Sequence, residues 1–221
     1  MKSNIQQSID NYKQAVALRT DHTQAPYGAP QLSTSPIVFE LSEKTQAVAY
    51  GGVALIHQLV NQIGLVDVLN SIPIFKRHLP YWESDHILNI AYNTFCGGTA
   101  LEHIEYRRND PTYLNMLGTH SIPDPTTAGD FCRRYNAATI DLLQDAINKV
   151  RLKVWRRQSR SFFKEAVVDI DGSIAPTYGE CKEGMDIAYN GDWGYHPLIL
   201  SLANTKEILF ISTVLNLLDT L

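Results

Sequence analysis

The stretch AVVDIDGSIAP, residues 166–176, decides how the second part of this 221-residue chain is interpreted. Apolar residues lead into Asp169 and Asp171, and a Gly-Ser step follows them. Because strand side chains alternate between the two faces, both carboxylates are expected on one face, at the end of a strand. The stretch alone is compatible with a metal-binding catalytic corner, a phosphate-transfer nucleophile or an exposed strand end without chemistry.

The composition is that of an ordinary globular protein. Hydrophobic residues make up 44% of the chain, which is enough for the core of one large domain or two small ones. The formal charge of −4 gives no sign of nucleic-acid binding across the whole chain, so any such contact has to come from local basic clusters. The sequence contains no apolar run of membrane-spanning length and no signal-peptide pattern near its start, so a cytoplasmic location without membrane contact is expected.

Three regions of the chain differ in pattern. Residues 1–45 are polar, include the proline-containing run APYGAPQLSTSP, and predict a mobile N-terminal arm. Residues 46–164 show helical periodicity. Residues 165–221 contain three strand patterns, EAVVDID, YHPLILSLA and EILFISTVL, and the short polar link NTK predicts that the last two form a hairpin. The expected fold class is therefore α+β, a helical region followed by a strand and a hairpin.

Spacing and end signals predict the first two helices of the middle region. Leu55, Leu59 and Ile63 are four residues apart and predict a helix that ends at Gly64. Ser84 is the expected N-cap of the next helix.

Two further helices are expected at residues 110–117 and 127–136. Thr127 and Asp130 stand at the spacing of a capping box. The pair of helices is compatible with a helix-turn-helix, but the connection GTHSIPDPT is longer than the usual three or four residues. A base-reading unit and a purely structural helical unit both remain open.

The aspartate pair has three interpretations. A strand ending in D-x-D-G-[ST] resembles the haloacid dehalogenase-type phosphatases, but only about fifty residues follow Asp171, which is too few for the rest of such a domain. The order of strand, loop and hairpin resembles the start of an RNase H-like fold, in which carboxylates hold two magnesium ions about 4 Å apart. In the third interpretation, the carboxylates are solvated and have no catalytic or metal-binding role.

Neighbouring residues favour the second interpretation. The run DIDGSIAPTYGECKEGMDIAYNGDWGYHPLILSLANTKEILF resembles the DDE-type insertion-sequence transposases of the transposase DDE domain group 1. The upstream run LGTHSIPDPTTAGDFCRRY resembles the helical N-terminal region of the same group. The resemblance covers roughly residues 37–210. It implies an RNase H-like domain that cleaves and transfers DNA strands at terminal inverted repeats, with a two-metal site for Mg²⁺ or Mn²⁺. It also implies a homodimer in the intact protein and association with the bacterial nucleoid.

Asp171 matches the first catalytic aspartate of the family, since Gly172 and Ser173 follow it, and Asp169 is the second choice. In relatives, the second aspartate and the glutamate lie further along the chain. The sequence departs from the family pattern after about Phe210, so a truncated and inactive copy with an incomplete RNase H-like domain is expected. The alternative is a non-catalytic fragment that binds DNA or dimerises and competes with an intact transposase.

DNA contact is expected from basic side chains in the helical region 46–164, because Lys and Arg supply phosphate contacts. Trp155, Phe162 and Phe163 are interleaved with the last of them. The arginine pair Arg107 and Arg108 is a weaker candidate. The expected DNA-binding residues are Arg133, Arg134, Arg151, Lys153, Arg156, Arg157, Arg160 and Lys164.

Overall fold

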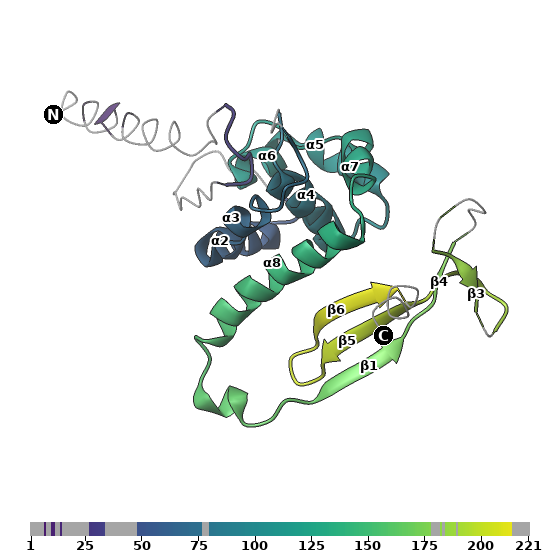
Figure 1. The fold of residues 1–221 in the computed structure, drawn as a ribbon. Coiled ribbons are helices and arrows are strands. Elements are labelled where there is room, and N and C mark those ends of the chain that lie inside the picture. Colours follow the sequence, from purple (N-terminus) through teal and green to yellow (C-terminus); the bar gives the residue numbers. More distant parts are fainter. Residues whose placement is uncertain are drawn as a thin grey trace. The chain divides into compact units, whose positions relative to one another are not determined.

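The computed structural model describes residues 27–33, 48–76, 80–177, 184–188 and 190–213, together with positions 7, 10, 11, 14 and 182. The chain divides into two compact units, Met1–Lys153 and Val154–Leu221, which are described separately. The first is helical and the second contains the strands, which confirms the α+β class (Figure 1). The predicted boundary near residue 164 stays a prediction.

The helical unit contains seven α-helices and one 3-10 turn within the described residues. Its largest fully buried side chains include Tyr92, Tyr113 and Leu117, which lie in one hydrophobic core. The last helix runs two residues beyond the division between the units. In chain order the elements are α2 (Gly52–Ile63), α3 (Leu65–Leu69), α4 (Glu83–Phe95), η1 (Leu101–His103), α5 (Ile104–Arg108), α6 (Pro111–Leu117), α7 (Pro125–Cys132) and α8 (Ala137–Trp155).

Local sequence signals determine several helix ends. Gly64 ends α2 with a φ of 73°, which confirms the predicted C-cap, since a left-handed residue is most easily a glycine. The predicted capping box at Thr127 is wrong: Asp124 is the N-cap of α7, and its Oδ1 accepts a hydrogen bond from the Thr127 N–H at 2.9 Å. Pro125 explains the earlier start, because proline fits the first helical position, where no N–H partner is needed.

The predicted helix is confirmed as α2, but the leucines that predict it do not form its buried face. Leu55 and Leu59 are 63% and 52% exposed, whereas Val53, His57 and Val60 are buried. The Nδ1 atom of His57 lies 2.9 Å from the hydroxyl of Tyr92 on α4, and this buried pair turns the opposite side of α2 inward.

The first turn of α4 is buried although it is polar. The predicted cap Ser84 is also wrong, because it lies inside the helix and Trp82 occupies the N-cap position. Asp85 accepts hydrogen bonds from the N–H groups of Trp82 and Leu32, at 2.9 and 2.8 Å. This carboxylate therefore joins the start of α4 to a segment more than fifty positions away.

Part of the predicted N-terminal arm is packed. Leu32 is fully buried in the helical core, and residues 27–33 are ordered into turns. Asp85 holds the Leu32 backbone against the start of α4, and the mobility of the arm stays a prediction. Apart from a few isolated positions, the rest of residues 1–45 lies outside the described residues.

The second unit contains two small antiparallel sheets and the 3-10 turn η2 (Arg160–Phe163). The predicted strand and hairpin are confirmed: β1 (Val168–Gly172), β5 (Pro197–Leu202) and β6 (Glu207–Thr213) form a sheet of order β1-β5-β6 (Figure 1). The sequence did not predict the second sheet, in which β4 (Trp193–Tyr195) lies between β2 (Ala175–Pro176) and β3 (Asp186–Ile187).

The turn between β5 and β6 is covered by aromatic side chains. The indole N–H of Trp155 donates to Oε2 of Glu207 at 2.9 Å, and the rings of Trp155 and Phe162 are 5.9 Å apart. Leu202 at the same end of the sheet is only 6% exposed. The first sheet is therefore covered at this end.

Candidate active site on strand β1

Strand β1 carries both aspartates of the sequence motif. Asp169 pairs with Ser201 and Asp171 pairs with Ile199 on β5. Directly opposite residues in an antiparallel pair share a face of the sheet, so the two carboxylates lie on one face beside Ser201 and Ile199. The intervening Ile170 and its partner Leu200 lie on the other face.

The two carboxylates lie in an open environment. Every residue of β1 is exposed, and the strand forms one edge of its sheet. Among the described residues, no hydrogen bond or ion pair occupies the carboxylate of Asp169 or Asp171. Two like charges two residues apart on one face favour a cation between or beside them. Carboxylate oxygens are also the ligands that Mg²⁺ prefers.

The donor set on β1 supplies part of a metal site. Within the described ranges, no three His, Cys, Asp or Glu side chains gather closely enough to hold a metal ion. The chemistry of the two carboxylates fits a hard divalent cation, and the rest of its coordination shell would come from water, DNA phosphates or further carboxylates.

The residues after β1 continue the pairing and fix a close contact. The Ser173 N–H donates to the Pro197 carbonyl at 2.9 Å, which extends the β1–β5 pairing beyond the strand. In the GYHPL run, a Cβ on Gly194 would lie 2.4 Å from the Ala175 carbonyl oxygen. Only glycine fits there, so this part of the motif has a packing reason.

The family model described as transposase DDE domain group 1 matches residues 38–212. The chain belongs to this transposase family. Membership implies transposition chemistry on DNA, which generally uses divalent metals. Searches of curated proteins and of solved structures find no match. In the parts that the structure describes, no helix of this transposase chain is long and apolar enough to cross a membrane.

The arginines of the helical unit differ in their contacts. Arg133 forms an exposed ion pair with Asp130, with 2.6 Å between Nη2 and Oδ1. The guanidinium of Arg134 lies 5.3 Å from the centre of the Phe75 ring. Arg107 is buried and donates to the Cys96 carbonyl at 2.8 Å, so its candidacy as a DNA contact is wrong: it links α5 to the end of α4.

The remaining basic candidates lie near the end of α8 and in η2. Arg151 donates to the side chain of Asn148 one turn earlier. The other five are exposed. Their role in DNA binding stays a prediction for the transposase chain. They are Lys153 on α8, Arg156 and Arg157 just after it, Arg160 in η2 and Lys164 after η2.

The predicted helix pair is present as α6 and α7. α6 starts after its cap Asp110, whose Oδ1 accepts from the Thr112 and Tyr113 N–H groups. The connection between α6 and α7 is buried in part, since Asn89 of α4 donates to the Pro123 carbonyl at 2.9 Å. Whether α7 reads bases stays a prediction.

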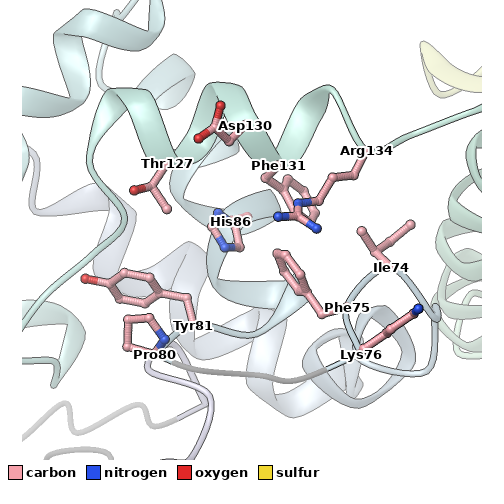
Figure 2. A pocket seen from close by; sticks show the side chains of 10 residues that line it. All are labelled: Ile74, Phe75, Lys76, Pro80, Tyr81, His86, Thr127, Asp130, Phe131 and Arg134. Atoms are coloured by element: carbon pink, nitrogen blue, oxygen red, sulfur yellow. The ribbon is translucent and has the colours of Figure 1, made fainter.

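A pocket of about 640 Å³ opens in the helical unit between α7 and the loop before α4. Figure 2 shows side chains from α7 and its end facing side chains from this loop. Sequence reasoning missed the pocket, because its residues come from separate segments and no spacing joins them. Its aromatic and basic lining residues are Phe75, Lys76, Tyr81, His86, Phe131 and Arg134.

Proposed function

We propose that the chain is an insertion-sequence transposase that cleaves and joins DNA phosphodiester bonds at terminal inverted repeats, with Asp171 as the first metal-binding carboxylate. The supporting observation is the pair of carboxylates on one face of β1, which have no partner among the residues that the structure describes and are followed by Gly172 and Ser173. The family match covers this strand and its hairpin.

The sheet β1-β5-β6 would be the first part of an RNase H-like domain. In such a domain, the aspartate-bearing first strand runs into an antiparallel hairpin, and the sheet has this order. β1 pairs with β5 over five consecutive residues, which holds the backbone under both carboxylates in a fixed position. The open face beside them leaves room for a DNA strand.

Asp171 and Asp169 would hold the divalent cations. When bound, the cations activate the attacking oxygen and stabilise the leaving oxygen of the phosphodiester. Two carboxylates from one strand cover one side of a cation, and in the family a second aspartate and a glutamate complete the site. We therefore expect these two carboxylates by themselves to bind a divalent cation weakly.

The exposed basic residues would contact the DNA backbone. Such contacts neutralise phosphates and release counterions, so binding falls steeply with salt. Recognition of two element ends at once favours a homodimer, and binding to DNA places the protein at the bacterial nucleoid.

Metal binding and cleavage test Asp171 directly. The purified chain is titrated with Mn²⁺ by electron paramagnetic resonance, then incubated with duplex DNA carrying the element ends and Mg²⁺ or Mn²⁺. Asp171→Asn should abolish Mn²⁺ binding and any nicking. The matched control Asp145→Asn removes an exposed carboxylate of α8 and should change neither. Nicking that survives in Asp171→Asn would contradict the assignment.

A non-catalytic DNA-binding role is the second candidate. The exposed basic residues around η2 favour it, because they depend on no metal. In that case, DNA binding would be salt-dependent and equal in the wild type and in Asp171→Asn, and neither protein would bind Mn²⁺ at β1.

A further inference from the structure

The pocket between α7 and the loop before α4 has an aromatic wall. The rings of His86 and Phe131 stack with centroids 4.4 Å apart and an angle of 10° between planes. Phe75 lies 5.3 Å from His86 and 5.5 Å from Phe131, tilted against both. Figure 2 shows these three rings close together in the middle of the pocket, with Tyr81 beside His86. His86 and Phe131 are buried against each other, so the partly exposed rings of Phe75 and Tyr81 are the ones that a flat, unsaturated ligand can contact.

The rim of the pocket has an excess of positive charge. Asp130 lines the pocket, but its carboxylate is paired with Arg133, which does not line it. The side chains of Lys76 and Arg134 have no hydrogen bond or ion pair to any residue within the described part of the chain. The two cations therefore remain available to an anionic ligand. Arg134 is already placed over the Phe75 ring, next to the aromatic wall.

His86 adds a polar group without a protein partner. It is only 2% exposed, lines the pocket, and has a buried Nδ1 atom without a hydrogen-bond partner in the described part of the chain. Burial, together with the nearby Arg134, lowers the pKa of His86 to about 4. The neutral ring can donate or accept one hydrogen bond, as recognition of a base edge requires.

We propose that this pocket holds one unpaired nucleotide of the DNA substrate, with its base against Phe75, the edge of the base toward His86 and the phosphate at Arg134 and Lys76. This inference rests on the proposed function, since it takes DNA as the substrate. Proteins that bind unpaired nucleotides combine aromatic stacking with a positively charged track for the backbone.

The size of the pocket favours a nucleotide over a bare phosphate contact. About 640 Å³ lies within the range of roughly 300–1,000 Å³ typical of small-molecule sites. A phosphate alone would leave the aromatic wall and the His86 nitrogen unused. A base pair inside a duplex cannot enter, so the ligand is a nucleotide outside the helix stack.

The experiment compares two DNA duplexes of the same sequence, one fully paired and one with a single unpaired 2-aminopurine nucleotide. The full-length chain should bind the second about tenfold more tightly, and the 2-aminopurine fluorescence should fall on binding, because the base stacks on an aromatic ring. Arg134→Gln and Phe75→Leu should each remove this preference.

Lys149→Gln is the matched control, because Lys149 is an exposed cation of α8 that does not line the pocket and is not one of the expected DNA-binding residues. It should keep the preference. Circular dichroism checks that each variant is folded, and Arg134 is exposed, so its replacement is tolerated without loss of the core.

Three outcomes would overturn the proposal. These are equal affinity of the wild type for both duplexes, equal weakening of the binding of both duplexes by Arg134→Gln, and loss of the preference in Lys149→Gln. None of these outcomes bears on the assignment of the proposed active site. That assignment is tested separately by Mn²⁺ binding to Asp171→Asn.

Discussion

The helical unit buries polar side chains, whereas the first sheet of the second unit exposes apolar ones. Glu83, Asp85 and His86 on α4 are at most 2% exposed, while Val168 and Ile170 on β1 are 52% and 60% exposed. Buried polar groups require specific partners, so they fix one arrangement of the chain, but each lost partner costs free energy. The helical unit therefore has the more uniquely defined packing. Strand β1 is the more accessible to solvent and ligands.

Asp85→Ala should have the largest effect on stability. The substitution leaves the N–H groups of Leu32 and Trp82 without their acceptor in a buried place, which should lower the free energy of unfolding by roughly 3 kcal/mol. Urea unfolding followed by circular dichroism measures it. Asp145→Ala, an exposed carboxylate on α8, should stay within about 0.5 kcal/mol of the wild type. A small effect of Asp85→Ala would show that the contact to Leu32 does not contribute.

Gly194→Ala should disturb the second unit alone. The new Cβ would meet the Ala175 carbonyl oxygen at 2.4 Å, and the backbone must shift, at roughly 2 kcal/mol. Hydrogen exchange should become faster in β2 and β4 and remain unchanged in α4. Gly172→Ala is the control, since nothing lies within 4 Å of its added Cβ. Equal exchange in both variants would contradict the close contact.

Acid should destabilise the helical unit through His86. Its pKa of about 4 in the folded chain lies below the ordinary value of 6.5, because burial and Arg134 disfavour the charged ring while Asp124 opposes them. The unfolded chain therefore binds the proton more readily, and the stabilisation, present above pH 6.5, is lost as the pH falls toward 4.

Between pH 7 and pH 4.5, the free energy of unfolding should fall by roughly 1–2 kcal/mol. Unfolding at pH 7 and pH 4.5 measures it, and the difference should shrink in His86→Phe. The buried Asp85, whose pKa is raised by burial, gives a change of opposite sign as the pH falls, so the contribution of His86 is taken from the difference between the wild type and His86→Phe. An unchanged difference in His86→Phe would remove His86 as the cause.

Trp155→Phe should have the smallest effect. It removes the donor to Oε2 of Glu207 but keeps a ring beside Phe162, and Thr205 still donates to the same oxygen at 2.8 Å. The free energy of unfolding should fall by roughly 1 kcal/mol. Thermal unfolding of the wild type and the variant measures it, with Trp193→Phe as an exposed control. A larger loss in the control would contradict the role of the indole contact.

Local patterns were sufficient to predict the strands, the hairpin and the C-cap at Gly64. They failed where a distant partner decides the outcome. Four-residue spacing alone could not show which side of α2 is buried, because the contact between His57 and Tyr92 determines it. The proline at the start of α7 likewise outweighed the pattern at Thr127.

The candidate sites follow the same division. Asp169 and Asp171 could be found because the motif is continuous in sequence and alternation puts both on one face. The pocket could not be found, since Phe75, His86 and Phe131 meet only after α4 and α7 pack together. The need for glycine at 194 depends on Ala175 across the sheet, and the sequence does not reveal that pairing.

The irregularity in β6 makes the number of residues in this strand as important as their identity. Phe210 pairs with Leu200 and Ile208 pairs with Ser201. Between these two pairs β6 has one residue more than β5, so the register changes there. Deleting that extra residue would remove the irregularity and leave the pairs on both sides of it in place, whereas deleting another residue of β6 would shift part of the strand by one position and turn its side chains to the other face of the sheet. A one-codon deletion in this strand should thus be tolerated best at the irregularity.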